Sequence, residues 1–244
     1  MNYLNNNANN EVMARGDALD ISQILRQVYL WMTFGLLATA GTALMISQTS
    51  LPGILLRNPF LWMIALFAEL GLVIFINARI MKLQPMTAAA LFIAYAVLNG
   101  VTLSFIFLSY RIGTITYAAI AAGAMFAATS IVAYATHIDL SRFSSLLFMA
   151  LIGLVVAMIV NVFFVSDTLT QLISYAGVLI FVALTAYDTQ RIKNLALSLS
   201  VDTSASESGL IQRISILGAL TLYLDMLNLF LFLLRILGGR GGRR

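Results

Sequence analysis

Residues 219–236 read ALTLYLDMLNLFLFLLRI, an apolar run long enough to cross a bilayer, with an aspartate near its middle. A charged side chain at the centre of a transmembrane helix costs about 2.5–3.5 kcal/mol on insertion scales. Polar or small residues recur on one face of this helix, namely Ser215, Gly218, Thr221, Asp225 and Asn228. Such a polar stripe must face protein or water rather than lipid. The sequence therefore predicts that this helix lies at the centre of a bundle.

The rest of the chain has the composition of an integral membrane protein. Of its 244 residues, 61% are hydrophobic and 10% are charged, and the mean hydropathy is +0.94. Soluble domains carry about 25% charged residues. No cysteine is present, which excludes thiolate chemistry, and the single histidine, His137, excludes a histidine-rich zinc site. The net charge of +4 comes mainly from short loops and a tail, so it bears on membrane topology rather than on nucleic-acid binding.

Seven apolar stretches reach the roughly 20 residues that a transmembrane helix needs. They are Val28–Gln48, Pro59–Ala78, Met86–Ser109, Ile115–Thr136, Ser145–Val165, Leu172–Gln190 and Ile214–Leu237. We predict an all-α integral membrane protein with a single seven-helix bundle over residues 23–238, a polar mobile tail over 1–22 and a basic tail over 239–244. Only the loop after the sixth span is long, and its sequence, SLSVDTSASESG at residues 198–209, is rich in serine. No span shows a clear Gly or Pro break, which favours a channel-like leak over a transporter.

Basic residues indicate the orientation, because cytoplasmic loops are enriched in Lys and Arg. With the N-terminus inside, the cytoplasmic segments hold Arg15, Arg26, Arg79, Lys82, Arg142, Arg191, Lys193 and Arg213, and the outer loops hold only Arg57 and Arg111. This pattern predicts a cytoplasmic N-terminus. The tail arginines at 235, 240, 243 and 244 break the pattern if the seventh span crosses. A re-entrant last segment would restore it, but Ile214–Leu237 is long enough to cross, and we expect it to do so.

Three acidic residues fall inside predicted spans: Glu69, Asp188 and Asp225. Asp188 could simply pair with Arg191, three residues later, at the membrane interface. Alternatively, Asp188 and Asp225 meet between consecutive helices. Two carboxylates in a medium of low dielectric disfavour each other's charge, so they tend to share one proton. The ionised pair would offer hard oxygen ligands suited to Ca²⁺, which makes the pair a candidate pH-dependent switch.

Two stretches give the chain a resemblance to a known family. AYDTQRI ends the sixth span and LYLDMLNLFLFLLRIL lies in the seventh. Together with seven spans, they resemble the Bax inhibitor-1 family, also called the transmembrane Bax inhibitor motif proteins. The short N-terminal segment resembles that of bacterial inner-membrane members.

The resemblance implies six helices around a central seventh and a pH-sensitive leak of Ca²⁺. It implies that Asp188 and Asp225 form a calcium- and proton-sensing pair between the sixth and seventh helices. A basic residue on the second helix latches this pair in the family; Arg79 is the nearest candidate here, and Arg191 competes for the role. Glu69, Asn228 and Thr221 are the other intramembrane polar candidates. We expect a monomer in the lipid bilayer, with no cofactor and with Ca²⁺ as the transported or regulatory ion.

Two other classes of function are compatible with parts of this sequence. The chain could modulate a membrane protease or quality-control complex without transporting anything. In that case the polar N-terminal tail could be the segment that contacts the partner. An intramembrane aspartyl protease would also place Tyr-Asp in one span, as Tyr187–Asp188 does here. That class requires a glycine-rich GxGD in the next span, whereas Leu222, Tyr223 and Leu224 precede Asp225. We therefore predict that the chain is not an enzyme.

Overall fold

A computed structural model describes the backbone of residues 2–136, 138–164, 166–202 and 208–239, and side chains within 22–198 and 209–239 except at positions 137 and 165. All regular structure in these ranges is helical. The elements are α1 Asn2–Ser47, α2 Leu51–Arg57, α3 Pro59–Arg79, η1 Ile80–Lys82, α4 Pro85–Leu103, α5 Ile106–Ser109, α6 Ile112–Ala135, η2 Leu140–Phe143, α7 Ser144–Phe163, α8 Asp167–Asp202 and α9 Ser208–Gly238. His137, the arginines at 240, 243 and 244 and the side chains of residues 1–21 lie outside the described part. The mobile N-terminal tail therefore stays a prediction.

Seven helical segments of the described chain are long and apolar enough to cross a membrane, as the sequence predicts. Turn residues set their starts. Asn58 caps α3, because its side-chain oxygen accepts hydrogen bonds from the backbone amides of Phe60 and Leu61 at 3.2 and 3.4 Å. Proline occupies the first turn of both α3 and α4, where no helical donor is lost.

Two details of the spans were not predicted. The third span, confirmed over Pro85–Ser109, contains a local turn: the amide of Ser104 donates to the carbonyl of Val101 at 3.3 Å, and its hydroxyl donates to the same oxygen at 2.6 Å. This tight local turn ends α4 at Leu103, and α5 begins at Ile106. The sixth helix is longer than expected, since α8 continues to Asp202 through part of the predicted Ser-rich loop.

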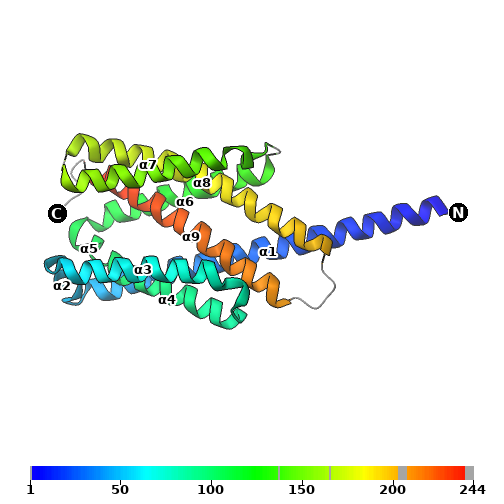
Figure 1. The fold of residues 1–244 in the computed structure, drawn as a ribbon, viewed down its shortest axis with the longest axis horizontal. Coiled ribbons are helices and arrows are strands. Elements are labelled where there is room, and N and C mark those ends of the chain that lie inside the picture. The colour runs from blue at the N-terminus through cyan, green and yellow to red at the C-terminus, as the bar shows by residue number, and fades with distance from the viewer. Residues whose placement is uncertain (1, 137, 165, 203–207, 240–244) are drawn as a thin grey trace.

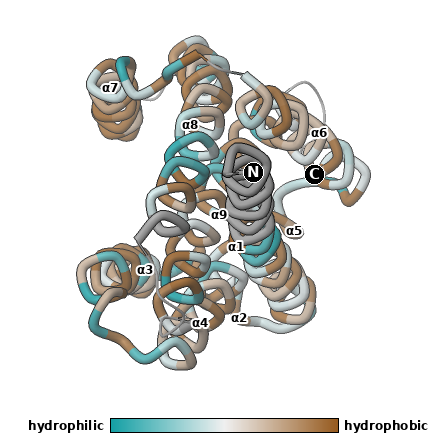
Figure 2. The backbone as a smooth tube through the Cα atoms, turned by 90° about the vertical axis from the view of Figure 1, so that its right-hand side faces the viewer, coloured by the Kyte–Doolittle hydropathy of each residue, from teal (hydrophilic) through white to brown (hydrophobic). Residues whose placement is uncertain are grey.

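Helix α9 lies at the centre of the bundle, as its polar stripe predicts. It runs diagonally through the molecule and packs against α1, α4, α6 and α8. Within the most apolar segment of α9, 56% of the residues are buried. The corresponding share is 6% in each of the spans that contain α3 and α7. Those two helices pack on α4 and α8 and form the periphery (Figure 2). The core therefore sits along α9.

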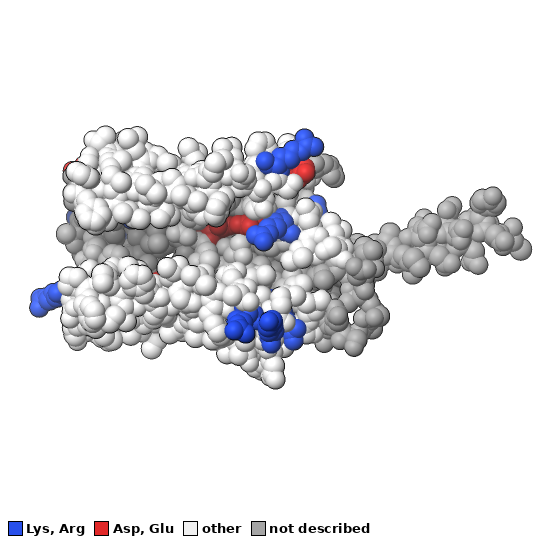
Figure 3. Space-filling view, viewed as in Figure 1, with Lys and Arg blue, Asp and Glu red and all other residues white. Residues whose placement is uncertain are grey.

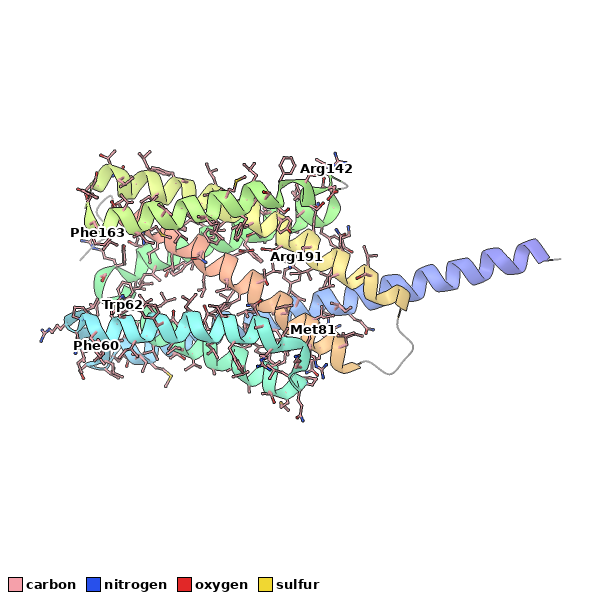
Figure 4. The ribbon with its side chains drawn as sticks, viewed as in Figure 1. Phe60, Trp62, Met81, Arg142, Phe163 and Arg191 are labelled. Carbon is pink, nitrogen blue, oxygen red and sulfur yellow. The ribbon has the colours of Figure 1, made fainter. Side chains whose placement is uncertain are left out.

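The last helix crosses the bundle from end to end. The start of α1 and the end of α9 lie at opposite ends of the molecule (Figure 1). Helix α9 is continuous over Ser208–Gly238 and is long and apolar enough to cross, so it does not fold back as a re-entrant segment would. Most of the visible basic side chains gather near the end where α9 begins (Figure 3), the end at which Arg142 and Arg191 also lie (Figure 4).

Candidate functional site

The two aspartates predicted to pair do meet. Helices α8 and α9 are antiparallel neighbours, and the carboxyl group of Asp225 lies within hydrogen-bonding reach of that of Asp188. Both side chains are buried, with 8% of Asp188 and 5% of Asp225 exposed. Oδ2 of Asp225 has no donor among the described residues. An oxygen in this position requires a proton, a water molecule or a cation.

Arg191 is the arginine beside the pair. Its Nη1 lies 4.0 Å from Oδ1 of Asp188, and 70% of its side chain is exposed, so this ion pair is long and well hydrated. A cavity of about 90 Å³ opens beside Asp188 and is also lined by Asn77 of α3 and Thr221 of α9. Figure 3 shows acidic surface next to basic surface at the floor of a groove in this region, where Arg191 lies (Figure 4). The pair is therefore reached from one side through a small polar opening.

Gln190 fixes the position of α8 next to the pair. Its Nε2 donates to the carbonyls of Ala133 and Ile138 at 3.2 and 2.9 Å, and its Oε1 accepts from the amide of Leu140 at 3.1 Å. One side chain thus holds the connection between α6 and η2, two residues from Asp188. Sequence reasoning missed this residue, although it lies within AYDTQRI, because its partners are backbone groups at least 50 positions away.

Tyr223 fixes α9 in a similar way. Its hydroxyl lies 2.6 Å from that of Thr39 on α1, and Thr39 in turn donates to the carbonyl of Ala96 on α4 at 2.9 Å. The ring of Tyr223 also packs edge-on against Phe92 and Tyr95. Tyr223 precedes Asp225 by two residues, so three helices determine where Asp225 lies. The sequence offered no signal for this role beyond a tyrosine in an apolar helix.

The other predicted candidates lie apart from the carboxyl pair or at its margin. Glu69 of α3 accepts a hydrogen bond from Thr102 of α4 and belongs to the α3–α4 contact. Asn228 donates to the carbonyl of Leu224 within its own helix at 2.8 Å. Thr221 also bonds within α9 but lines the polar cavity. Arg79 is exposed in the last turn of α3, and the ion pairs found among the described residues do not include it.

The chemistry open to this site is that of two facing carboxyl groups. Among the described residues, no group of three or more His, Cys, Asp or Glu side chains could hold a metal ion. Ca²⁺ prefers about six to eight oxygen ligands, and a carboxyl pair supplies only part of that set. Protons and weakly held cations are therefore the ligands that the arrangement can accept.

Comparison with known proteins gives a consistent result. Residues 21–242 match the family described as "Inhibitor of apoptosis-promoting Bax1". The chain is 45% identical over 217 residues to the inner membrane protein YbhL of Escherichia coli (strain K12), covering 88% of this chain and 91% of that protein. Uncharacterized proteins of Borreliella burgdorferi and Deinococcus radiodurans are each 39% identical, over 220 and 226 residues, covering 90% and 92% of this chain and 93% and 94% of those proteins. This multi-pass membrane protein therefore belongs to the Bax inhibitor-1 family.

Proposed function

We propose that the protein is a passive, pH-sensitive pathway for Ca²⁺ leak across the bacterial inner membrane. Protonation of the Asp188–Asp225 pair gates this pathway. The observation that carries the proposal is the meeting of two buried carboxyl groups from neighbouring helices, one of them on the central helix α9.

Elementary electrostatics explains why such a pair responds to pH. Two ionised carboxylates in contact repel each other strongly where water is scarce. A single proton between them removes the repulsion and holds α8 to α9 through a hydrogen bond. When the proton leaves, the two helices separate or a cation takes its place. The pair thus couples the packing of α9 to the proton concentration and to Ca²⁺.

The incomplete ligand set supports passage rather than storage. A resident Ca²⁺ needs further hard oxygen donors close to the two aspartates, and the described acidic side chains form no larger cluster. An ion held by few ligands leaves readily, and conduction requires binding sites that ions can leave. We propose no enzymatic reaction and no resident cofactor.

Arg191 is the counter-charge that the geometry favours for the ionised state of Asp188. Arg79 follows Asn77 by two residues, and Asn77 lines the cavity beside Asp188. At 3.6 residues per turn, Arg79 lies roughly on the opposite side of α3 from Asn77. A latch through Arg79 therefore requires α3 to rotate, whereas Nη1 of Arg191 already lies 4.0 Å from Oδ1 of Asp188.

The location and orientation are part of the same proposal. The E. coli relative is named an inner membrane protein, which supports that location for this chain. The basic side chains near the beginning of α9 support a cytoplasmic position for that end and for the N-terminus.

The test is Ca²⁺ entry into liposomes that contain the purified protein, followed with a trapped fluorescent indicator over a range of pH. Protein-free liposomes of the same lipid composition are the control. We expect entry above the control at some pH values and a clear change with pH. Entry equal to the control at every pH would overturn the proposal.

A further inference from the structure

A second facing pair of side chains lies on the same contact between α8 and α9. The rings of Phe181 and Phe232 stack with centroids 5.8 Å apart and planes tilted by 31°. Phe181 precedes Asp188 by seven residues, and Phe232 follows Asp225 by seven. Seven residues are about two helical turns, or roughly 10 Å along each axis. The two antiparallel helices therefore keep one register, with the aromatic pair two turns beyond the carboxyl pair.

The same seven-residue step leads from the rings to a second polar cavity. Ser174 on α8 and Gly239 after α9 lie one step further on, and both line a cavity of about 230 Å³. Asp167, Gln171 and Arg235 also line this outer cavity, so named because it lies at the end of the molecule where α9 ends. The seam between α8 and α9 thus has a polar cavity on either side of its two facing pairs.

The segment between the outer cavity and the aspartates is closed and apolar. Only 7% of Phe181 and 4% of Phe232 is exposed. Gly177 makes room for the second ring: a Cβ at this position would lie 2.7 Å from ring carbons of Phe232. Thr185, which is fully buried between the rings and Asp188, donates its hydroxyl to the carbonyl of Phe181 at 2.7 Å. The one hydrogen-bond donor of the Thr185 side chain is therefore already used within its own helix.

We propose that Phe181 and Phe232, the latter seated on Gly177, form an aromatic barrier that separates the outer cavity from the Asp188–Asp225 pair. Water and cations reach the pair from the outer cavity only when the ring of Phe232 leaves Gly177. Apolar constrictions of this kind exclude water, and with it ions. The barrier concerns access along the seam; its consequence for Ca²⁺ rests on the proposed leak function.

Single cysteines test the barrier without any assumption about conduction, because the chain has none of its own. Gln171→Cys reports on the outer cavity, and Thr185→Cys reports on the segment behind the rings. A cationic, membrane-impermeant methanethiosulfonate reagent is applied to the side at which Gln171→Cys reacts. With both rings present, we expect Gln171→Cys to react and Thr185→Cys to be protected. In a Phe232→Ala background, Thr185→Cys should react about tenfold faster or more.

Two further variants keep this experiment decisive. Phe230→Ala makes the same change on α9, but Phe230 lines a different, apolar cavity together with Leu36 and Ala119, so protection of Thr185→Cys should persist. Phe232→Leu retains more apolar bulk and should give a smaller increase than Phe232→Ala. It also tests the barrier if the alanine variant does not fold. The barrier is wrong if Thr185→Cys reacts as fast as Gln171→Cys with both rings intact. It is equally wrong if neither change at Phe232 accelerates the reaction.

Ca²⁺ entry into liposomes then separates the two proposals. We expect Phe232→Ala to raise the entry rate several-fold over the wild type and Phe230→Ala to leave it unchanged. If access to Thr185→Cys opens in Phe232→Ala while neither protein admits Ca²⁺, the barrier stands and the leak function fails. If the wild type admits Ca²⁺ and access to Thr185→Cys never changes, the leak stands and the barrier fails.

Discussion

The hydroxyl group of Tyr223 lies 2.6 Å from that of Thr39, and this contact ties the central helix α9 to α1. The Thr39 hydroxyl donates its own hydrogen bond to a backbone carbonyl, either that of Ala96 on α4 or that of Gly35. The tyrosine hydroxyl is therefore the donor in the pair. Because Asp225 is two residues away, the bond contributes to holding the carboxyl pair in register.

Tyr223→Phe removes this donor and leaves the ring contacts in place. Thr39 keeps its carbonyl partner, so the expected loss is one buried hydrogen bond, or about 1 kcal/mol of unfolding free energy. Tyr117→Phe is the matched control, since Tyr117 is exposed on α6. The measurement is reversible unfolding in mixed micelles. Equal stability of the two variants would contradict the role assigned to Tyr223.

Gln190→Leu should detach the connection between α6 and η2 from α8. The change removes three hydrogen bonds and leaves the carbonyls of Ala133 and Ile138 without this donor, at a cost of about 2 kcal/mol. We expect faster hydrogen exchange at the amide of Leu140, because this amide donates its hydrogen bond to Oε1 of Gln190. Gln171→Leu, on the exposed side of the same helix, should leave that exchange unchanged. Unaltered exchange in Gln190→Leu would show that the connection between α6 and η2 does not depend on the hydrogen bonds of Gln190.

Gly177→Ala tests the seat of the Phe232 ring by adding a single carbon. The new Cβ would overlap the ring, so either the ring or α8 must shift, at a cost of about 1–3 kcal/mol. Gly153→Ala on α7 is the control, because a Cβ there meets nothing within 4 Å. This control should gain up to about 1 kcal/mol from helix propensity. Thermal unfolding of both variants is the measurement, and a stabilised Gly177→Ala would contradict the tight seat.

The seven spans and the central position of α9 could be predicted from the sequence, because hydropathy and a polar stripe are properties of single helices. The meeting of Asp188 with Asp225 required the family resemblance as well. The stacking of Phe181 on Phe232 depends on the register between two helices, which neither helix encodes alone. The break at Ser104 was missed because a hydropathy window does not respond to one local turn.

Asp139 provides a pH effect outside the membrane spans. Hydrogen bonds from the side chain and the backbone of Ser141 lower the pKa of Asp139 from its ordinary value of 3.8. Because the folded pKa lies below the unfolded one, this cap stabilises η2 above pH 3.8 and is lost as the pH falls through the lowered value. Exchange protection of the Ser141 amide should therefore be constant near neutral pH and decrease only in strong acid. A decrease near neutral pH would contradict this assignment.

Deletion of residues 2–21 distinguishes the leak from modulation of a partner protein. The apolar part of α1 that is long enough to cross the membrane lies within Ser22–Ser47, so we expect the bundle to remain intact without these residues. If the seven-helix bundle itself conducts, the shortened protein should admit Ca²⁺ into liposomes at the wild-type rate. Loss of entry by a folded, shortened protein would show that the tail is needed and would contradict a pathway confined to the bundle.

The most direct test of the account is the pH profile of Ca²⁺ entry for Asp225→Asn. This change keeps the shape of the side chain but removes one member of the proton-sharing pair. Asp139→Asn, the same change at an exposed acid outside the spans, is the control. The account predicts the same pH-dependent profile for the wild type and Asp139→Asn, and a shifted or flattened profile for Asp225→Asn, because the two carboxyl groups can no longer share a proton. A wild-type profile in Asp225→Asn would contradict the claim that the carboxyl pair is the gate.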